Sequence, residues 1–413
     1  MIPSDNLQTM HLHPLRLQNQ IQDYAWGSRT AIQALLGAED SGIPWAELWM
    51  GAHPKAPSSV VIDDKNDQTI PLNDLVSRYP ERLLGAAAVR TFGNTLPFLF
   101  KVLAAEKPLS IQAHPGREMA KAGYERENRA GIPLDAPHRN YRDPWPKPEI
   151  ICAVEPFVAL NGFRPARIIA EWFETLCPGR LSDQVRMLRN DPGEGGIKAM
   201  FESLVRMGPE DKKAVVETAV GRAADIDAVE GGWVARLAKH YPGDIGVLCP
   251  LYLNLVHLEP YTAMFLAPGQ MHAYLEGVGI ELMANSDNVL RGGLTGKHVD
   301  TDELMRVVRF DPSSVEIITP VSKNTCERIF PVDAKEFALS VLQTNGRPGC
   351  GADADHGFEI LLCMEGSAEI RWDGAEANLS VGKGESFMVP ACSGAYEIIG
   401  EALFFKASVP EPT

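Results

Sequence analysis

Short stretches of alternating apolar and polar residues recur along this chain, and such alternation is typical of half-buried β-strands. Residues 96–103 are a largely apolar run of strand length, and residues 109–114 alternate strictly between apolar and polar. Two further strand-like runs, 358–364 and 368–374, are separated by Glu365-Gly366 and predict a β-hairpin. The pattern therefore predicts a fold built mainly from β-strands.

One part of the chain follows a different period. Over residues 165–248 apolar residues recur at the three- and four-residue spacing of amphipathic helices. Pro178-Gly179 is expected to end one of these helices. Pro209 is expected to begin another, because proline and the acidic residues after it suit a first helical turn. We interpret this segment as a helical insertion without catalytic residues of its own.

The order of these patterns predicts the domain organisation. A chain of 413 residues has room for two or three domains. We expect residues 1–164 and 249–319 to form one cupin-like domain, interrupted by the insertion at 165–248. We expect residues 320–413 to form a separate jelly-roll domain. The predicted fold class is mainly β, with cupin or jelly-roll barrels and an inserted α-helical domain.

Composition and charge restrict the possible partners. The net charge of −15, from 39 basic and 54 acidic residues, argues against binding to nucleic acid. A few local Arg and Lys side chains still suffice to bind a small anion. Since no apolar run reaches the roughly 18 residues of a membrane span and no secretory signal pattern begins the chain, we expect a cytoplasmic protein that does not bind a membrane. The seven scattered cysteines contain no CxxC pair, and we expect reduced thiols.

The densest group of chemically useful side chains lies between residues 272 and 297, HAYLEGVGIELMANSDNVLRGGLTGK. It contains one His, two Glu, one Asp, two Asn, one Arg and one Lys among small and apolar residues. Its several glycines make a helix unfavourable, since each interior Gly costs about 1 kcal/mol relative to Ala. We therefore predict a strand, a turn, a second strand and an exposed glycine-rich loop, with polar side chains directed into a cavity.

This stretch resembles the second signature of the type I mannose-6-phosphate isomerases (phosphomannose isomerases). That signature contains H-A-Y, a Gly, E-x-M-A-x-S-D-N and R-A-G-x-T-P-K. In this chain Gly292 replaces the Ala and Gly296 replaces the Pro, and the other positions agree. The segments ELWMGAHP at 47–54 and QAHP at 112–115 are also similar to family segments.

A further stretch, YRDPWPKPE at residues 141–149, resembles the first family signature, Y-x-D-x-N-H-K-P-E. Trp145 and Pro146 stand where the family has Asn and His. An imidazole that the family carries near its site is therefore missing. Any role of that His in proton transfer does not apply to this chain.

The resemblance implies one zinc ion per chain, held by Gln112, His114, Glu149 and His272. On a strand Gln112 and His114 point the same way, which suits two ligands of one ion, although a Q-x-H pattern alone more often marks a polar strand face. Two imidazoles, one carboxylate and one amide oxygen suit a catalytic zinc, and cobalt, manganese or nickel can bind to such a set.

The family reaction is the interconversion of mannose 6-phosphate and fructose 6-phosphate through an enediol. Such a reaction needs an acid and a base of tuned pKa, and positive charge beside the developing negative oxygen. The candidate catalytic residues are Arg291, Glu281, Asp287 and Lys147. The candidate contacts to the substrate anion are Ser110, Lys101 and Lys297.

We assign proton transfer to a carboxylate, either Glu281 or Asp287, with Lys147 as its electrostatic partner. Arg291 precedes two glycines and suits forked recognition of a phosphate or of the enediolate, whereas its alternative interpretation is a surface salt bridge.

Two other functions remain open from the sequence. One is a cupin metal enzyme of another class, such as an iron dioxygenase, which would need a facial set of two His and a carboxylate in one barrel. The other is a relative that binds sugar phosphate without catalysis, which a missing metal ligand would favour. Since all four ligands implied by the resemblance are present, we expect an isomerase that acts as a monomer on a small sugar phosphate.

Overall fold

The computed structural model describes residues 12–410, apart from 40, 64–65, 67, 224, 347–348 and 375–377. The start of the chain, where no secretory signal is expected, therefore lies largely outside the described residues. The chain divides into two compact units. The first comprises Met1–Ala104, Ile280–Asn285 and Ile318–Thr413, and the second comprises Ala105–Gly279 and Ser286–Ile317.

An antiparallel sheet of eleven strands, among the described residues, dominates the first unit. Its order is β14-β15-β16-β21-β18-β20-β1-β4-β5, with β17 paired to β21 and β19 paired to β18. The bounds are β1 (Leu15–Gln18), β4 (Ser59–Asp63), β5 (Gln68–Pro71), β14 (Val321–Ser322), β15 (Glu327–Ile329), β16 (Ala338–Gln343), β17 (Gly351–Ala352), β18 (Glu359–Trp372), β19 (Leu379–Gly382), β20 (Ser386–Val389) and β21 (Tyr396–Ser408). Large apolar side chains such as Phe387, Ile398 and Phe404 are fully buried in its core.

Among the described residues the first unit also contains a smaller group of strands and four short helices. The strands are β2 (Gln20–Gln22), β3 (Glu47–Gly51) and β6 (Phe98–Ala105), and the helices are α2 (Ala31–Leu36), α3 (Leu72–Arg78), α4 (Pro80–Leu84) and α5 (Ala86–Phe92). β3 lies between β2 and β6, and all of these pairs are antiparallel. β6 is buried along its whole length, as its apolar run predicts.

The second unit is organised around one long strand, β12 (His272–Ala284), whose last residues belong to the first unit. β9 pairs with β12 and β10, β7 pairs with β12 and β13, and β8 pairs with β12 and β11. The bounds are β7 (Ile111–Ala113), β8 (Glu149–Ala153), β9 (Phe157–Phe163), β10 (Leu253–Leu258), β11 (Ala263–Leu266) and β13 (Leu290–Gly293). β12 therefore brings segments together that are far apart in the sequence.

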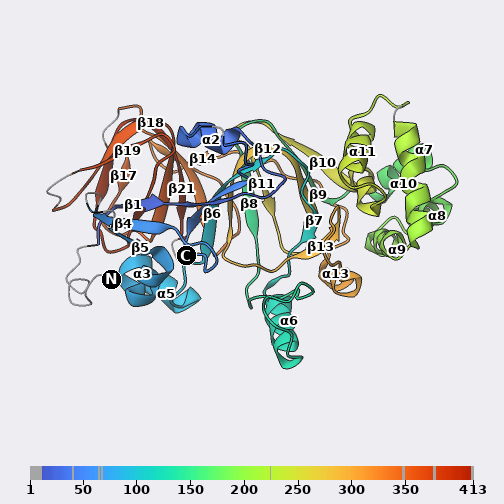
Figure 1. Cartoon of the computed structure of the whole chain (residues 1–413), viewed down its shortest axis with the longest axis horizontal. Helices are drawn as coiled ribbons and strands as arrows, with labels where there is room; N and C mark the ends of the chain where they lie inside the picture. The colour runs from blue at the N-terminus through green and yellow to red at the C-terminus, as the bar shows by residue number, and fades with distance from the viewer. Residues whose placement is uncertain are drawn as a thin grey trace. The chain divides into compact units, whose positions relative to one another are not determined.

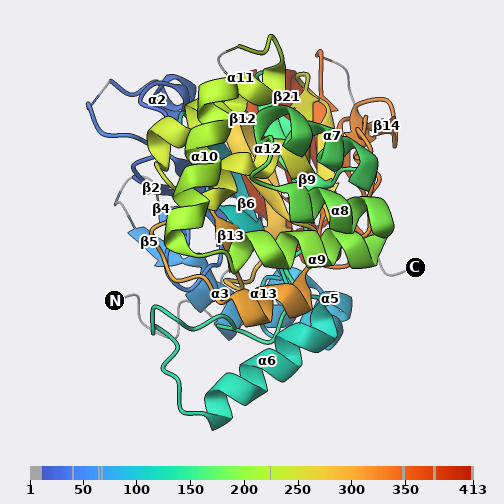
Figure 2. The same cartoon turned by 90° about the vertical axis from the view of Figure 1, so that its right-hand side faces the viewer.

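Helices fill the chain between β9 and β10, and Figures 1 and 2 show them as one group. They are α7 (Ala166–Leu176), α8 (Ser182–Asn190), α9 (Glu194–Val205), α10 (Pro209–Ala223), α11 (Val229–His240), the 3₁₀ helix η1 (Ile245–Leu248) and α12 (Cys249–Tyr252). α10 begins at Pro209 as predicted. Phe163 of β9 contacts Phe201 of α9, with ring centroids 5.7 Å apart, so these helices share an apolar core with the strands.

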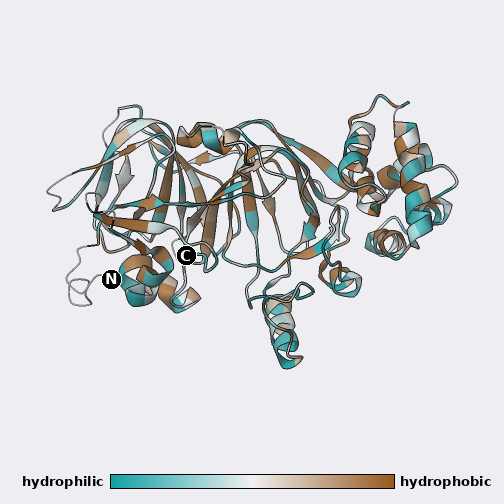
Figure 3. Ribbon diagram, viewed as in Figure 1, coloured by the Kyte–Doolittle hydropathy of each residue, from teal (hydrophilic) through white to brown (hydrophobic). Residues whose placement is uncertain are grey.

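Two more helices belong to the second unit, α6 (Arg117–Arg129) and α13 (Thr301–Val307). α6 is rich in charged residues, and Figure 3 shows it mostly teal, whereas the strands of both units are largely brown. No helix within the described ranges has the length and apolar character that crossing a membrane requires.

The predicted hairpin at Glu365-Gly366 is wrong. These residues lie inside the single strand β18, which pairs with β21 along its length. The register shifts between Cys363 and Glu365, and Gly366 has a φ of 74°. The Glu-Gly pair therefore forms an irregularity within one strand instead of a turn between two, which is a common use of glycine in strands.

Two predictions for residues 272–297 also need correction. The first strand and the expected second strand are one continuous element, β12, and its glycines lie within it. Gly292 and Gly293 are buried in β13, so this part of the expected exposed loop is a strand, whereas Gly296 and Lys297 after it lie in an exposed turn. A Cβ at Gly292 would lie 2.7 Å from Cε of Met271, so close packing explains this glycine.

Cys326 and Cys350 form a disulfide, so the expectation of reduced thiols is wrong for this pair. The two residues are 24 positions apart, and the spacing alone did not indicate their pairing. The free cysteines among the described residues are Cys152, Cys177, Cys249 and Cys363, which are buried, and Cys392, which is exposed.

Candidate metal centre and active site

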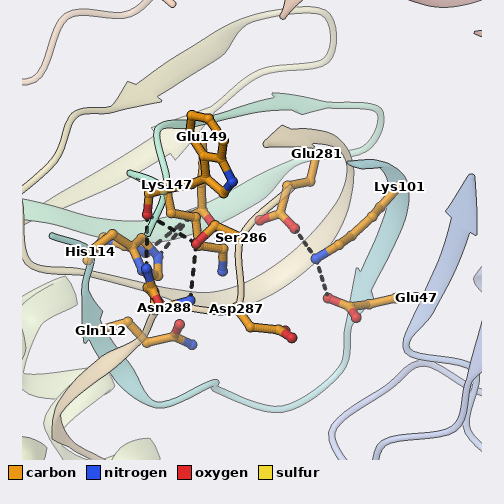
Figure 4. Close-up of polar contacts among 12 residues, drawn as sticks. Glu47, Lys101, Gln112, His114, Lys147, Glu149, Glu281, Ser286, Asp287 and Asn288 are labelled. Carbon is orange, nitrogen blue, oxygen red and sulfur yellow. Dashed lines mark hydrogen bonds and ion pairs between the residues drawn. The ribbon is translucent and has the colours of Figure 1, made fainter. Parts of the chain in front are cut away.

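Three of the predicted metal ligands converge in the second unit. Their ligand atoms all lie within 4.8 Å of one another, and all three side chains are buried. Nε2 of His114 and Nε2 of His272 each lie 3.4 Å from Oε2 of Glu149 (Figure 4 labels His114 and Glu149). His114 directly follows β7, Glu149 begins β8 and His272 begins β12. The pairing of β7 and β8 with β12 is what brings the three residues together.

The other ring nitrogens of both histidines face backbone carbonyls. Nδ1 of His114 lies 2.8 Å from the carbonyl oxygen of Asn288, and Nδ1 of His272 lies 3.1 Å from that of Gln270. An imidazole that donates from Nδ1 keeps its lone pair on Nε2 for a metal ion. Both rings are therefore oriented to offer Nε2 at the point where they meet.

The electrostatics of the cluster fit a bound cation. Burial lowers the pKa of His114 to about 4, and this outweighs the opposing effect of Glu149. The ring is therefore neutral at neutral pH, and its buried Nε2 has no hydrogen-bond partner in the part of the chain that the structure describes. A buried acceptor without a partner is costly, so a metal ion in contact with it would supply what the protein lacks there.

Glu149 is held in its ionised form. Burial alone would raise its pKa, but Lys147 and the two imidazoles lower the pKa of Glu149 well below its usual value. Nζ of Lys147 lies 3.0 Å from Oε1 of Glu149, and both residues are buried. The cluster thus combines one carboxylate with two imidazole nitrogens, a donor set that suits zinc.

Gln112 lies beside this set. It is opposite His272 in the pairing of β7 with β12, and opposite Arg291 in the pairing of β7 with β13. Its side chain is half-buried, with Nε2 3.4 Å from the hydroxyl of Ser110. Figure 4 shows Gln112 below His114.

A hydrogen-bonded lock holds the loop between β12 and β13 against the segment before β8. Asp143 accepts hydrogen bonds from Oγ of Ser286 and the backbone N of Asp287, each at 2.8 Å. Asn288 is fully buried and donates Nδ2 to the backbone oxygens of Asp143 (2.8 Å) and Trp145 (2.9 Å). Because the carbonyl of Asn288 faces His114, this lock also positions a candidate ligand.

A separate buried cluster lies within the first unit. Nζ of Lys101 is 2.8 Å from Oε2 of Glu281 and 3.3 Å from Oε1 of Glu47 (Figure 4). Trp49 donates its indole N–H to the other oxygen of Glu47 at 2.8 Å. Glu281 is on β12, so one strand carries a metal-ligand candidate at its start and this carboxylate near its end.

Two arginines lie near one another in the second unit. Arg291 on β13 is half-buried, and within the described part of the chain neither Arg291 nor Arg142 forms an ion pair. Burial lowers the pKa of Arg291, and the neighbouring charge of Arg142 lowers it further. The structure thus gives no support to the alternative that Arg291 makes a surface salt bridge. Two neighbouring positive charges that form no ion pair with a carboxylate favour the binding of an anion between them.

Comparison with known proteins identifies the family. Residues 14–166 match the family described as phosphomannose isomerase type I, catalytic domain. The chain is 42% identical over 385 residues to the mannose-6-phosphate isomerase of Salmonella typhimurium, covering 91% of this chain and 94% of that protein. The chain belongs to the type I mannose-6-phosphate isomerase family. It is also 33% identical over 321 residues to the human mannose-6-phosphate isomerase, covering 71% of this chain and 72% of that protein.

Solved structures agree with this family assignment. A mannose 6-phosphate isomerase from Salmonella typhimurium, bound to substrate and a zinc atom, superimposes with a TM-score of 0.89 at 37% identity, covering 97% of this chain and 100% of that one. A zinc-bound mannose 6-phosphate isomerase also has a TM-score of 0.89, at 36% identity, with coverage of 97% and 100%. Of the three functions considered from the sequence, these relatives favour the isomerase.

The other predicted residues of this mannose-6-phosphate isomerase family member have varied surroundings. Asp287 is half-buried in the locked loop, and Lys297 is in an exposed turn where its backbone N donates to Thr295. Lys147 was expected beside Glu281 or Asp287, whereas its ion-pair partner is Glu149 and that of Glu281 is Lys101.

Sequence reasoning missed two residues at this site, Arg142 and Asp143. Both lie inside the first signature stretch, and their place in that stretch was the signal that could have found them. Their roles depend on hydrogen bonds and charges between the two stretches, and no spacing within either stretch shows these contacts.

Proposed function

We propose that this protein is a zinc-dependent mannose-6-phosphate isomerase that interconverts mannose 6-phosphate and fructose 6-phosphate through an enediol intermediate. The observation that carries the proposal is the buried set of His114, Glu149 and His272 in a chain of this family, in which Nε2 of the neutral His114 ring has no hydrogen-bond partner among the described residues. Gln112 completes the zinc ligands. When bound, zinc supplies positive charge beside the substrate oxygens on which negative charge develops.

The protein's own residues move the proton between the two substrate carbons. The base is Glu281 or Asp287. Lys101, 2.8 Å from Glu281, stabilises the carboxylate form that a base needs. The backbone N of Asp287 donates a hydrogen bond to Asp143, which helps to hold Asp287 in the loop between β12 and β13. Lys147 holds Glu149 ionised and so acts on the metal ligand.

Positively charged side chains bind the negatively charged groups of the substrate. Arg291 is the main contact, because its guanidinium has no carboxylate partner among the described residues and its planar fork fits a phosphate or an enediolate. Arg142 adds a second positive charge near it. Ser110, Lys101 and Lys297 remain the other proposed substrate contacts.

We also propose the finer features of architecture that the sequence predicts. The two β regions are cupin or jelly-roll barrels, with domain segments 1–164, 165–248, 249–319 and 320–413. The enzyme is a cytoplasmic monomer that acts on a free sugar phosphate.

A coupled assay tests the function. Mannose 6-phosphate is supplied, formation of fructose 6-phosphate is followed, and each preparation is measured as purified, after chelation and after zinc is restored. We expect activity to disappear with chelation and to return with zinc. His272→Ala should lose both activity and stoichiometric metal, whereas His257→Ala, on the exposed part of β10, should lose neither. An active preparation without metal, or a fully active His272→Ala enzyme, contradicts the proposal.

A further inference from the structure

A cavity lies in the first unit and involves none of the residues discussed so far as site candidates. It has a volume of about 810 Å³ and is lined by the ends of the C-terminal strands and their loops, from Lys323 to Pro410. Figure 1 shows the strands that carry it, including β17, β18 and β21. A cavity of this size can enclose a small ligand, since such sites usually measure about 300–1,000 Å³.

The strands turn a polar face toward this cavity. Neighbouring lining positions on a strand are two residues apart, as expected for side chains on one face: Ala338 and Ser340 on β16, and Lys406 and Ser408 on β21. The residue between the second pair, Ala407, is fully buried on the opposite face. One face of the strand is therefore apolar core, whereas the cavity face carries a charge and hydroxyl groups.

Buried charges form the floor of the cavity. Nζ of Lys406 lies 2.9 Å from Oε1 of Glu327 and 3.0 Å from Oε1 of Glu359, and all three residues are at most 4% exposed. The hydroxyl of Tyr396 donates to the other oxygen of Glu359. Well-packed apolar residues are often at least as stabilising as a buried ion cluster, so core packing alone does not explain this floor.

The protonation states of the floor leave hydrogen-bonding capacity for a ligand. Burial lowers the pKa of Lys406, but the two carboxylates outweigh it and raise the pKa above its usual value, so Lys406 stays charged. Burial raises the pKa of Tyr396 well above its usual range, so its hydroxyl remains a donor. Each carboxylate oxygen has a second lone pair and Lys406 has a third N–H. The floor thus offers both acceptors and a donor.

The charge around the cavity opposes an anionic ligand. The described lining residues include six acidic side chains and three basic ones, so an anion such as a sugar phosphate is disfavoured. The ammonium of Lys406 at the floor is already paired with Glu327 and Glu359, so it offers no free positive charge to an anion. A metal site is also unsupported, because in the described part of the chain only His114, Glu149 and His272 bring three such ligand atoms within 4.8 Å.

An aromatic surface completes the cavity wall. Trp372 lines the cavity, and its indole stacks on His13 with centroids 4.8 Å apart and planes within 7°. A ring held in this way presents a fixed apolar surface, which suits the C–H face of a sugar ring, while carboxylates and hydroxyls suit its OH groups. We propose that this cavity binds an uncharged sugar of one or two rings, separately from the metal centre.

Saturation-transfer NMR tests this inference with methyl α-D-mannoside, methyl β-D-glucoside and maltose, each at millimolar concentration. Excess mannose 6-phosphate is present to occupy the proposed active site. We expect saturation transfer to at least one of these sugars, undiminished by mannose 6-phosphate. Ala338→Phe, which fills the cavity without removing a polar group, should abolish it, and Trp372→Ala should weaken binding at least about 10-fold, the effect of losing roughly 1.4 kcal/mol.

Controls make the outcome decisive. Trp172→Ala, at a half-buried position on α7, should keep wild-type sugar binding. Melting curves and isomerase activity show whether each variant folds, and Trp372→Ala should retain wild-type kcat. The inference is overturned if none of the three sugars receives saturation, if mannose 6-phosphate abolishes the transfer, or if Ala338→Phe folds normally and binds sugar like the wild type. Because kcat is measured separately, failure here is distinguishable from failure of the proposed isomerase function.

Discussion

At the scale of single residues, charge without a partner is the most informative feature. A half-buried guanidinium usually has a carboxylate nearby, because desolvating a charge is costly. Arg291 has a second guanidinium, that of Arg142, near it and no ion pair within the described residues. The protein thus maintains a repulsive pair that a bound anion would relieve, which is the arrangement expected of a substrate site.

Replacing Arg291 should therefore affect catalysis. We expect Arg291→Ala to lower kcat and kcat/KM together, on the order of 10²-fold or more, as for other preorganised charge-stabilising donors. Arg291→Lys should rescue only part of the loss, since lysine keeps the charge without the planar fork. Steady-state kinetics on mannose 6-phosphate decide this, with Arg167→Ala on an exposed position of α7 as the control. A raised KM with unchanged kcat would restrict Arg291 to binding the phosphate. No change in either constant would exclude both roles.

The identity of the base is also a question about single residues. We expect either Glu281→Gln or Asp287→Asn to lower kcat by roughly 10²- to 10⁴-fold, the usual contribution of general acid–base catalysis. Glu281→Gln removes the charge that faces Lys101, so Lys101→Met should also impair activity if Glu281 is the base. The measurement is kcat for each variant after its metal content is matched to the wild type. Wild-type kcat in both carboxylate variants would remove them as bases.

At the scale of elements, the loop between β12 and β13 links the two signature stretches. Its side chains are tied to Asp143 and Trp145, and its backbone carbonyl at Asn288 faces a ligand histidine. A loop held in this way can keep one ring orientation without metal, which reduces the reorganisation needed when an ion binds.

Breaking this lock should weaken metal binding without removing a ligand. We expect Asn288→Ala to lower zinc affinity about 10- to 100-fold, the usual effect of changing a residue that supports a ligand. It should also destabilise the fold by about 1–3 kcal/mol, because the partly buried partners of Nδ2 and Oδ1 lose their hydrogen bonds. Zinc titration against a competing chelator measures the affinity, and Asn190→Ala at the end of α8 serves as control. Unchanged affinity in Asn288→Ala would show that the lock has no influence on the metal.

Elements also show where sequence patterns succeed and fail. β6 and β7 follow from their apolar run and strict alternation, because burial on one or both faces leaves a clear period in the sequence. The hairpin at Glu365-Gly366 was predicted wrongly, since glycine has the same conformational freedom in a turn and in a strand irregularity. Only the pairing of β18 with β21 distinguishes these cases, and that pairing joins residues distant in sequence.

At the scale of the whole molecule, some residues of the candidate site were predictable from the sequence and others were not. The resemblance to two signatures and to the QAHP segment predicted His114, Glu149 and His272 as partners from three separate segments, and the structure brings them together. The partners of Lys147 and Glu281 and the place of Arg142 were not predictable, because each depends on which strand lies beside which. The disulfide between Cys326 and Cys350 was likewise not predictable, because it joins residues that only the folded chain brings together.

The disulfide should contribute to the stability of the whole chain. Cross-linking residues 24 positions apart restricts the unfolded chain, which typically stabilises a protein by roughly 2–4 kcal/mol. We expect Cys350→Ala, or reduction of the wild type, to lower the midpoint of urea unfolding. Cys392→Ala, which removes an exposed free thiol, should leave it unchanged. Thiol counting under denaturing conditions gives the redox state directly, and equal midpoints for oxidised and reduced protein would contradict this expectation.

Metal binding should also stabilise the whole chain, because the ligands come from segments that only the folded state brings together. An ion that binds only the native state adds about 4 kcal/mol at a free concentration near 1,000 times its dissociation constant. The melting temperature of the chelated protein should therefore rise with each increment of free zinc, and magnesium should have little effect because the site presents two imidazole nitrogens. His272→Ala should show no such rise, whereas His257→Ala should behave as the wild type, which separates this site from zinc bound by exposed groups. A melting temperature that is independent of zinc in the wild type, or a rise of the same size in His272→Ala, would place the stabilising ion elsewhere.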